Sequence, residues 1–167
     1  MTVAGMVKDE ELAELIGDVI ACGSARIVYK MRDDDRWVIK KGRAAPYASN
    51  KKEWEIWKEI AGSAIAPLFG KCQAVSNSYQ YLVMEYLNDL DATDTARVPA
   101  MPAWLTDRKR SALGKAPNGD IKVLDYAQVR DCADRINAPK QAWPSEGETS
   151  SMRDLMARLN STGNEGE

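Results

Sequence analysis

Hydrophobic and polar positions alternate over much of the first half of this chain, which is typical of β-strands. Apolar content and flanking turns predict strands in four stretches, 19–31, 36–41, 68–75 and 79–86. The first of these stretches is long enough for two strands joined by a tight loop. Two other stretches, 8–16 and 50–61, carry apolar residues at helical spacing between charged ones. The pattern predicts an α+β fold, with about five antiparallel strands and a helix packed against them.

The second half of the chain is more polar and is broken by prolines. Pro99 and Pro102 interrupt the stretch that follows the last of these strands. A short apolar run at 121–124 predicts one more strand, directly after an Asn-Gly turn. Residues 128–136 and 151–159 have helical character, and the second of these has a regular apolar face.

These elements divide the chain into two parts. We predict a sheet-containing part with an N-terminal helix over residues 1–87, a reduced helical part over 88–160 and a flexible tail over 161–167. A chain of 167 residues with 44% hydrophobic content can bury a core of its own. The chain is therefore expected to be globular.

Charge and hydropathy limit the partners. The net charge of −2 gives no general attraction to nucleic acid or to an anionic membrane. No apolar run approaches the ~20 residues that span a bilayer. Residues 1–18 are acidic and lack the basic and then apolar order of a signal peptide. We expect a cytoplasmic protein without a nucleic-acid or membrane partner.

The cysteines and the missing histidines exclude several chemistries. Cys22, Cys72 and Cys132 are far apart and form no C-x-x-C pair, so neither a zinc site nor a disulfide framework is indicated. The sequence contains 0 histidines, which excludes a histidine base and histidine metal ligands. Acid–base chemistry would have to use carboxylates, lysine or tyrosine.

A loop and a lysine are the first candidates for a binding site. Gly23 and Ser24 lie between two predicted strands, where small residues let backbone amides approach an anion. Strand alternation puts Lys40 on the same face as Val38 and so under this loop. The alternatives are an ordinary hairpin turn and an exposed lysine at the end of a strand.

The predicted helix 50–61 offers a partner for Lys40. Glu53, Glu55 and Glu59 are the candidates, and helical phase does not decide among them. Glu53 is also placed for a capping box with Asn50, a structural role that would compete with an ion pair to Lys40.

Asp125 is a further candidate, because it directly follows the predicted strand 121–124. A carboxylate at the end of a buried strand is unusual without a partner or a metal, and hard cations prefer carboxylate oxygens. Its alternative role is to cap a helix that follows.

In this order the segments resemble the nucleotide-binding half of a protein kinase. The matching pieces are Ala21-Cys22-Gly23-Ser24-Ala25 for the glycine-rich loop, Trp37-Val38-Ile39-Lys40 for the strand with the lysine, Tyr81 to Leu87 for the strand that enters the hinge, Thr106-Asp107 for the catalytic loop and Asp125-Tyr126-Ala127 for D-F-G. The chain departs from the kinase pattern in the glycine-rich loop and after the catalytic aspartate. The loop has one glycine of three, with Arg26 or Ile27 at the third position, and Ala112 stands where an asparagine would bind a second metal ion.

The resemblance implies a role for each candidate. Gly23, Ser24, Lys40 and Glu53 would position the phosphates of ATP, backbone groups near Glu85 and Leu87 would bind the adenine, Asp107 would accept the proton of the substrate hydroxyl, and Asp125 would bind Mg²⁺. ATP and Mg²⁺ are thus the expected cofactors. The residues after Asp125 are too few for the large kinase lobe that holds a peptide.

This balance of matches and departures favours a pseudokinase that binds or inhibits a partner protein, such as a host protein of a phage. The alternative is a minimal active enzyme, either an ATP-dependent protein (Ser/Thr) kinase or a small-molecule phosphotransferase. Small size and a reduced second part are what we expect of a phage-encoded protein of this kind.

Overall fold

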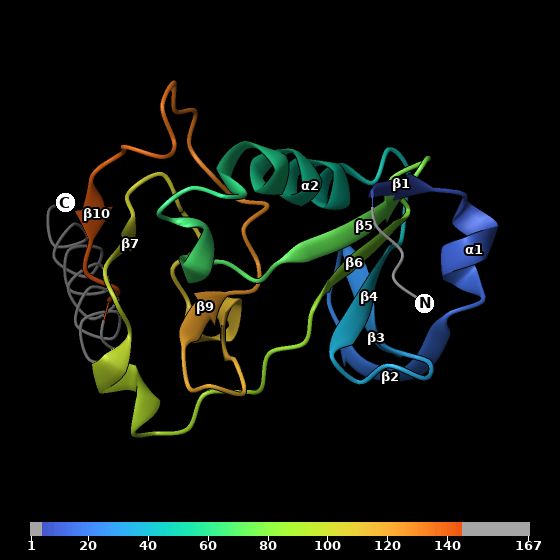
Figure 1. Ribbon diagram of the computed structural model, residues 1–167, viewed down its shortest axis with the longest axis horizontal. Coiled ribbons are helices and arrows are strands. Elements are labelled where there is room, and N and C mark those ends of the chain that lie inside the picture. The colour runs from blue at the N-terminus through green and yellow to red at the C-terminus, as the bar shows by residue number, and fades with distance from the viewer. Residues whose placement is uncertain (1–4, 145–167) are drawn as a thin grey trace, which may run out of the picture.

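The computed structural model describes residues 5–144 and has a mixed six-stranded sheet with the strand order β1-β5-β6-β4-β3-β2 (Figure 1). Two helices accompany this sheet. The elements of this first part are β1 (Gly5–Val7), α1 (Asp9–Ala13), β2 (Ile16–Cys22), β3 (Arg26–Met31), β4 (Trp37–Gly42), α2 (Ala48–Ile60), β5 (Cys72–Ser76) and β6 (Tyr81–Glu85).

The α+β class is confirmed, and the strands predicted between residues 19 and 86 are present as β2 to β6. The sheet is not purely antiparallel, however, because β1 adds a sixth strand that runs parallel to β5, with Met6 opposite Val75. The pattern did not predict β1, since three residues beginning with glycine show no alternation. The N-terminal helix is also shorter than predicted, because β2 begins at Ile16.

The two faces of the sheet are covered by different helices. Ile39, Tyr81 and Val83 pack against Leu12 of α1 on one face. Val38 and Leu82 belong to the larger core, which contains the apolar side of α2. The alternation expected for β4 is therefore correct, and it places Lys40 on the α2 side of the sheet.

The second part contains short strands and turns. Its strands are β7 (Met101–Pro102), β8 (Leu113–Lys115), β9 (Ile121–Val123) and β10 (Lys140–Gln141), with 3-10 turns at Asp94–Arg97 and Arg110–Ala112. An earlier 3-10 turn, Ala66–Leu68, lies in the first part between α2 and β5. The predicted helical second part is wrong for the residues described, because no α-helix occurs between residues 88 and 144 and residues 128–136 have an irregular backbone with bends. The predicted helix at 151–159 and the tail at 161–167 lie outside the described residues.

This second part shares the core of the sheet. Phe69 directly follows the 3-10 turn Ala66–Leu68, and its ring stacks on that of Trp104 with centroids 5.4 Å apart. The rings of Phe69 and Tyr126 form an edge-to-face pair with centroids 5.2 Å apart. The β8–β9 hairpin is tied to the segment after β6, because Asn88 and Lys115 exchange backbone hydrogen bonds of 2.9 and 2.8 Å. Segments distant in sequence thus meet beside the end of β6.

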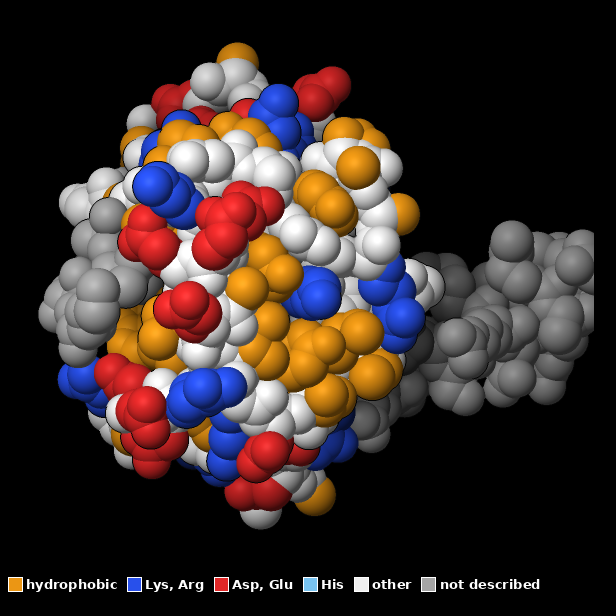
Figure 2. All heavy atoms as spheres, turned by 90° about the vertical axis from the view of Figure 1, so that its right-hand side faces the viewer, with side chains coloured by type: hydrophobic (Ala, Val, Ile, Leu, Met, Phe, Trp, Pro, Cys, Tyr) orange, Lys and Arg blue, Asp and Glu red, His pale blue; other side chains and the backbone are white. Residues whose placement is uncertain are grey.

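The surface near α1 mixes charges of both signs with apolar side chains, and neither sign dominates that face (Figure 2). Among residues 5–144, none of the helices has the length and apolar character needed to cross a bilayer.

Gly114 tests the contact between β8 and the segment after β6. A Cβ atom at this position would lie 2.5 Å from Cβ of Leu87 and 2.9 Å from Cδ2 of Leu124. We expect Gly114→Ala to lower the free energy of unfolding by about 1–3 kcal/mol in urea titrations, since the backbone has to move. Gly23→Ala is the control, because its Cβ would meet only the carbonyl oxygen of Arg26 at 3.5 Å. Equal effects of the two substitutions would contradict the close contact.

Candidate functional site

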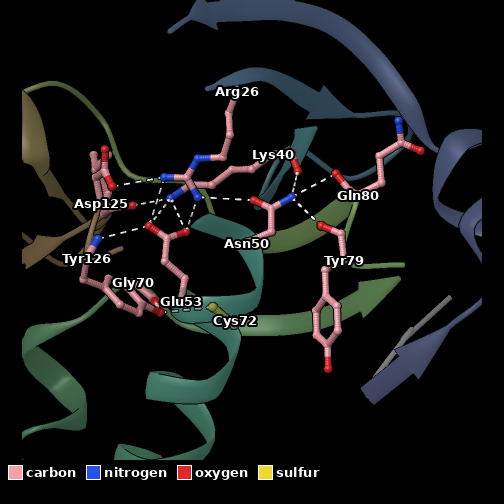
Figure 3. Close-up of polar contacts among 11 residues, drawn as sticks. Arg26, Lys40, Asn50, Glu53, Gly70, Cys72, Tyr79, Gln80, Asp125 and Tyr126 are labelled. Carbon is pink, nitrogen blue, oxygen red and sulfur yellow. Dashed lines mark hydrogen bonds and ion pairs between the residues drawn. The ribbon is translucent and has the colours of Figure 1, made fainter. Parts of the chain in front are cut away.

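The buried carboxylate of Glu53 is the centre of a cluster of polar contacts (Figure 3). Nζ of Lys40 donates to its two oxygens at 3.3 and 3.1 Å. The guanidinium of Arg26 binds it with two hydrogen bonds, of 2.6 and 3.1 Å, and the backbone amide of Tyr126 donates to it at 3.0 Å. Glu53 therefore joins α2 to β4, to β3 and to the segment after β9.

Glu53 is thus the partner of Lys40 among the three glutamates considered. The other two point to different cations, because Glu55 lies 3.9 Å from Lys51 and Glu59 lies 3.1 Å from Arg135. Nζ of Lys40 also donates to the carbonyl oxygen of Leu124, so the lysine contacts both α2 and the strand that precedes Asp125.

Asn50 supports the cluster and does not cap the helix. The helix begins at Ala48, before Asn50, and no side chain caps it. The predicted capping box is therefore wrong. Nδ2 of the buried Asn50 donates to three backbone carbonyl oxygens of β4 and of the turn before β6, which belong to Lys40, Tyr79 and Gln80 at 3.0, 3.0 and 2.9 Å. Asn50 thereby fixes the first turn of α2 against the strand that carries Lys40.

The electrostatics of the cluster keep Glu53 ionised. Burial opposes the charge, but Arg26 and Lys40 more than offset it and lower the pKa of Glu53 to about 2. Burial lowers the pKa of Lys40, and Arg26 adds to this effect while Glu53 opposes it.

Burial also raises the pKa of Cys72 to about 12, so this thiol is protonated at neutral pH. Its sulfur lies 3.0 Å from the hydroxyl of Tyr126, which itself lies 3.0 Å from the carbonyl oxygen of Gly70.

Lys40 also lines a pocket of about 610 Å³ between the sheet and the second part. The pocket is mainly apolar, and its lining includes Ile20, Ala21, Val28, Val38, Met84, Leu113 and Leu124. The segment Glu85–Leu87 forms one side. Among the described residues, none accepts a hydrogen bond from the Leu87 amide. The pocket therefore combines apolar walls with the buried lysine of the Lys40–Glu53 ion pair.

Three of the predicted nucleotide-binding residues, Lys40, Glu85 and Leu87, line this pocket. Gly23 and Ser24 do not, because they belong to the exposed turn between β2 and β3, where the Gly23 amide donates to the Arg26 carbonyl at 2.8 Å. Ile20 and Ala21, which precede this turn in β2, line the pocket instead. A role for Gly23 and Ser24 in phosphate binding stays a prediction.

Asp107 lies outside the pocket lining, and its carboxylate pairs with Nζ of Lys109 at 2.9 Å. The hydrogen bond to Asp107 raises the pKa of Lys109, and the charge of Asp125 adds to this effect, so Lys109 lies in the field of both aspartates.

Ala112 is fully buried, and its carbonyl oxygen accepts a hydrogen bond of 2.8 Å from the backbone amide of Leu124. Its backbone thus holds the strand before Asp125.

Arg26 is the site residue whose role sequence reasoning missed. Its Nη2 donates to Oδ1 of Asp125 at 3.0 Å, and its Nη1 donates to Oδ1 of Asn50 at 3.3 Å, in addition to its contacts with Glu53. The available signal was its position, since Arg26 begins β3, the strand whose Val28 lies opposite Lys40 of β4. The structure joins Arg26, Lys40, Glu53 and Asp125 in one cluster.

No protein-family model matches the chain, and no curated protein sequence is significantly similar to it.

Glu53→Gln tests the ionised state of the cluster. Because the folded pKa of about 2 lies below the ordinary value of 4.5, the carboxylate stabilises the fold above pH 4.5, and this contribution is lost as the pH falls toward about 2. At pH 7 the substitution should cost about 3–5 kcal/mol in urea titrations, since it leaves two buried cations without their shared anion. The difference from wild type should shrink on acidification.

Glu59→Gln is the matched control for this substitution. Its carboxylate is 44% exposed and pairs with Arg135, so its loss should cost at most about 1 kcal/mol. Equal stability of Glu53→Gln and wild type at pH 7 would show that Glu53 is not the charged centre of the cluster.

Proposed function

We propose that this chain is a kinase-like nucleotide-binding protein that holds an adenine nucleotide without transferring its phosphate and acts through a partner protein. The observation that supports this most directly is the buried Lys40–Glu53 pair beside a pocket that the Glu85–Leu87 segment also lines. In protein kinases a pair of this kind positions the phosphates, and the segment equivalent to Glu85–Leu87 binds the adenine.

The dimensions and chemistry of the pocket suit a purine base. A volume of about 610 Å³ lies in the usual range of small-molecule sites, and such sites have apolar walls with a few oriented polar groups. Val28 and Val38 contribute apolar surface from the sheet, and Leu113 contributes it from β8. The Leu87 amide would donate to a ring nitrogen of the base between them.

The residues around Asp107 favour binding over phosphate transfer. Asp107 is paired with Lys109 and does not line the pocket. Ala112 has a methyl group where a kinase places a metal-binding asparagine. The alternative, an active protein kinase or small-molecule phosphotransferase, would require Asp107 to leave Lys109 for the substrate hydroxyl.

A bound nucleotide that is not hydrolysed stabilises the folded state by mass action and so keeps one surface available to a partner. We therefore propose that the chain acts by binding another protein. The partner is unidentified, and the net charge of −2 offers no general attraction to nucleic acid or to an anionic membrane.

Adenosine and ATP binding test this proposal by calorimetry and thermal melting. At about a hundred times its dissociation constant, either ligand should stabilise the fold by about 2.7 kcal/mol. Ala21→Phe should weaken binding at least tenfold, because Ala21 is an exposed residue of β2 that lines the pocket. Cys22→Phe is the matched control, since the adjacent Cys22 is also exposed but does not line the pocket.

Two outcomes would count against the proposal. If neither adenosine nor ATP bound at millimolar concentration, the nucleotide site would be rejected. If ATP bound and the protein then released ADP or labelled an acceptor faster than the Asp107→Asn variant, the active phosphotransferase would replace the pseudokinase.

A further inference from the structure

The cation nearest to Asp125 is a side chain of the protein itself. Nη2 of Arg26 lies 3.0 Å from Oδ1 of Asp125, and the arginine side chain is only 11% exposed. The same guanidinium binds both oxygens of Glu53. Arg26 therefore bridges the two carboxylates of the cluster at the place where a kinase would bind its metal ion (Figure 3).

The charges of the cluster balance without a metal ion. Arg26 and Lys40 supply two positive charges, and Glu53 and Asp125 supply two negative ones. Without Arg26 the remaining three groups would carry one net negative charge beside the pocket, which would attract an external cation. The arginine removes that excess charge.

The donor set does not fit Mg²⁺. This ion requires near-octahedral oxygen coordination and is usually bound through one or two carboxylates. Here Asp125 already binds Arg26, and Ala112 has no side-chain donor. Within residues 5–144 no group of three or more acidic or cysteine side chains could hold a metal ion. A magnesium ion at Asp125 would have to displace the guanidinium of Arg26, whose side chain is 11% exposed, from the partly exposed carboxylate.

We propose that the chain binds its adenine nucleotide without a divalent metal ion, because the Arg26 guanidinium occupies the position beside Asp125 and neutralises it. The inference rests on the proposed function. It adds that nucleotide binding at the same site does not depend on Mg²⁺. The affinity then comes from the apolar pocket and the Leu87 amide. The phosphates lie beside a cluster whose charges are already balanced.

The test measures binding of ATP and of adenosine by calorimetry, in excess EDTA and in millimolar Mg²⁺. Wild type should bind ATP with dissociation constants that agree within about threefold in the two buffers. Arg26→Ala uncovers Asp125, so ATP should bind this variant at least tenfold more tightly in Mg²⁺ than in EDTA. Arg43→Ala is the matched control, because Arg43 is exposed and donates to the Gly23 carbonyl, not to Asp125. It should behave as wild type.

Arg26→Lys is the second variant in case Arg26→Ala does not fold. It keeps one positive charge beside Asp125 and should remain independent of Mg²⁺. Binding of ATP to wild type that is at least tenfold tighter in Mg²⁺ than in EDTA would overturn the inference. Adenosine separates the two proposals, because it has no phosphate. If adenosine binds and ATP needs Mg²⁺, the inference alone fails, whereas if neither ligand binds in either buffer, the proposed function fails and the inference fails with it.

Discussion

The ionised carboxylate of Glu53 is the interaction on which the rest of this structure depends. It is completely buried, and it accepts hydrogen bonds from Lys40, Arg26 and the amide of Tyr126. Burying a carboxylate costs several kcal/mol, so this arrangement is stable only because two cations and a backbone donor surround it. The three donors come from β4, from β3 and from the segment after β9. One side chain of α2 thereby fixes the sheet, the helix and the second part together.

The pocket follows from this arrangement. With Lys40 held toward α2 and the strand before Asp125 held by Ala112, the space between the sheet and β8 remains lined by apolar side chains. The segment Glu85–Leu87 is fixed separately, because Lys122 pairs with the carboxylate of Glu85 at 2.8 Å. The pocket thus has an apolar side, where the proposed function would place the base, and a charged side at Lys40. On the charged side, Arg26 and Lys40 pair with Glu53 and Asp125, which is the basis of our proposal that the site does not recruit a metal ion.

The sequence predicted the strands and the face of Lys40 well, because alternation on a half-buried sheet is a local property. It could not predict β1, whose three residues gain their order only from parallel pairing with β5. Asn50 and Arg26 were misjudged for a similar reason. Its sequence position suggested that Asn50 caps the helix, but in the fold its side chain donates to three carbonyl oxygens outside the helix. Arg26 binds Asp125, which lies 99 positions further along the chain. The helical second part was predicted from spacing, but the described residues there form short strands, 3-10 turns and irregular segments that pack on the core around Trp104 and Tyr126.

The most direct test of the cluster is a double-mutant cycle on Arg26 and Asp125, with Arg26→Met, Asp125→Asn and the double variant compared in urea titrations. The side chains of Arg26 and Asp125 are 11% and 34% exposed. Methionine and asparagine keep much of the volume of each, so the single variants should still fold. The structure predicts a coupling free energy of about 1 kcal/mol or more between them, since they are direct partners. Additive effects, with a coupling near zero, would show that Arg26 does not neutralise Asp125 and would contradict this account of the site.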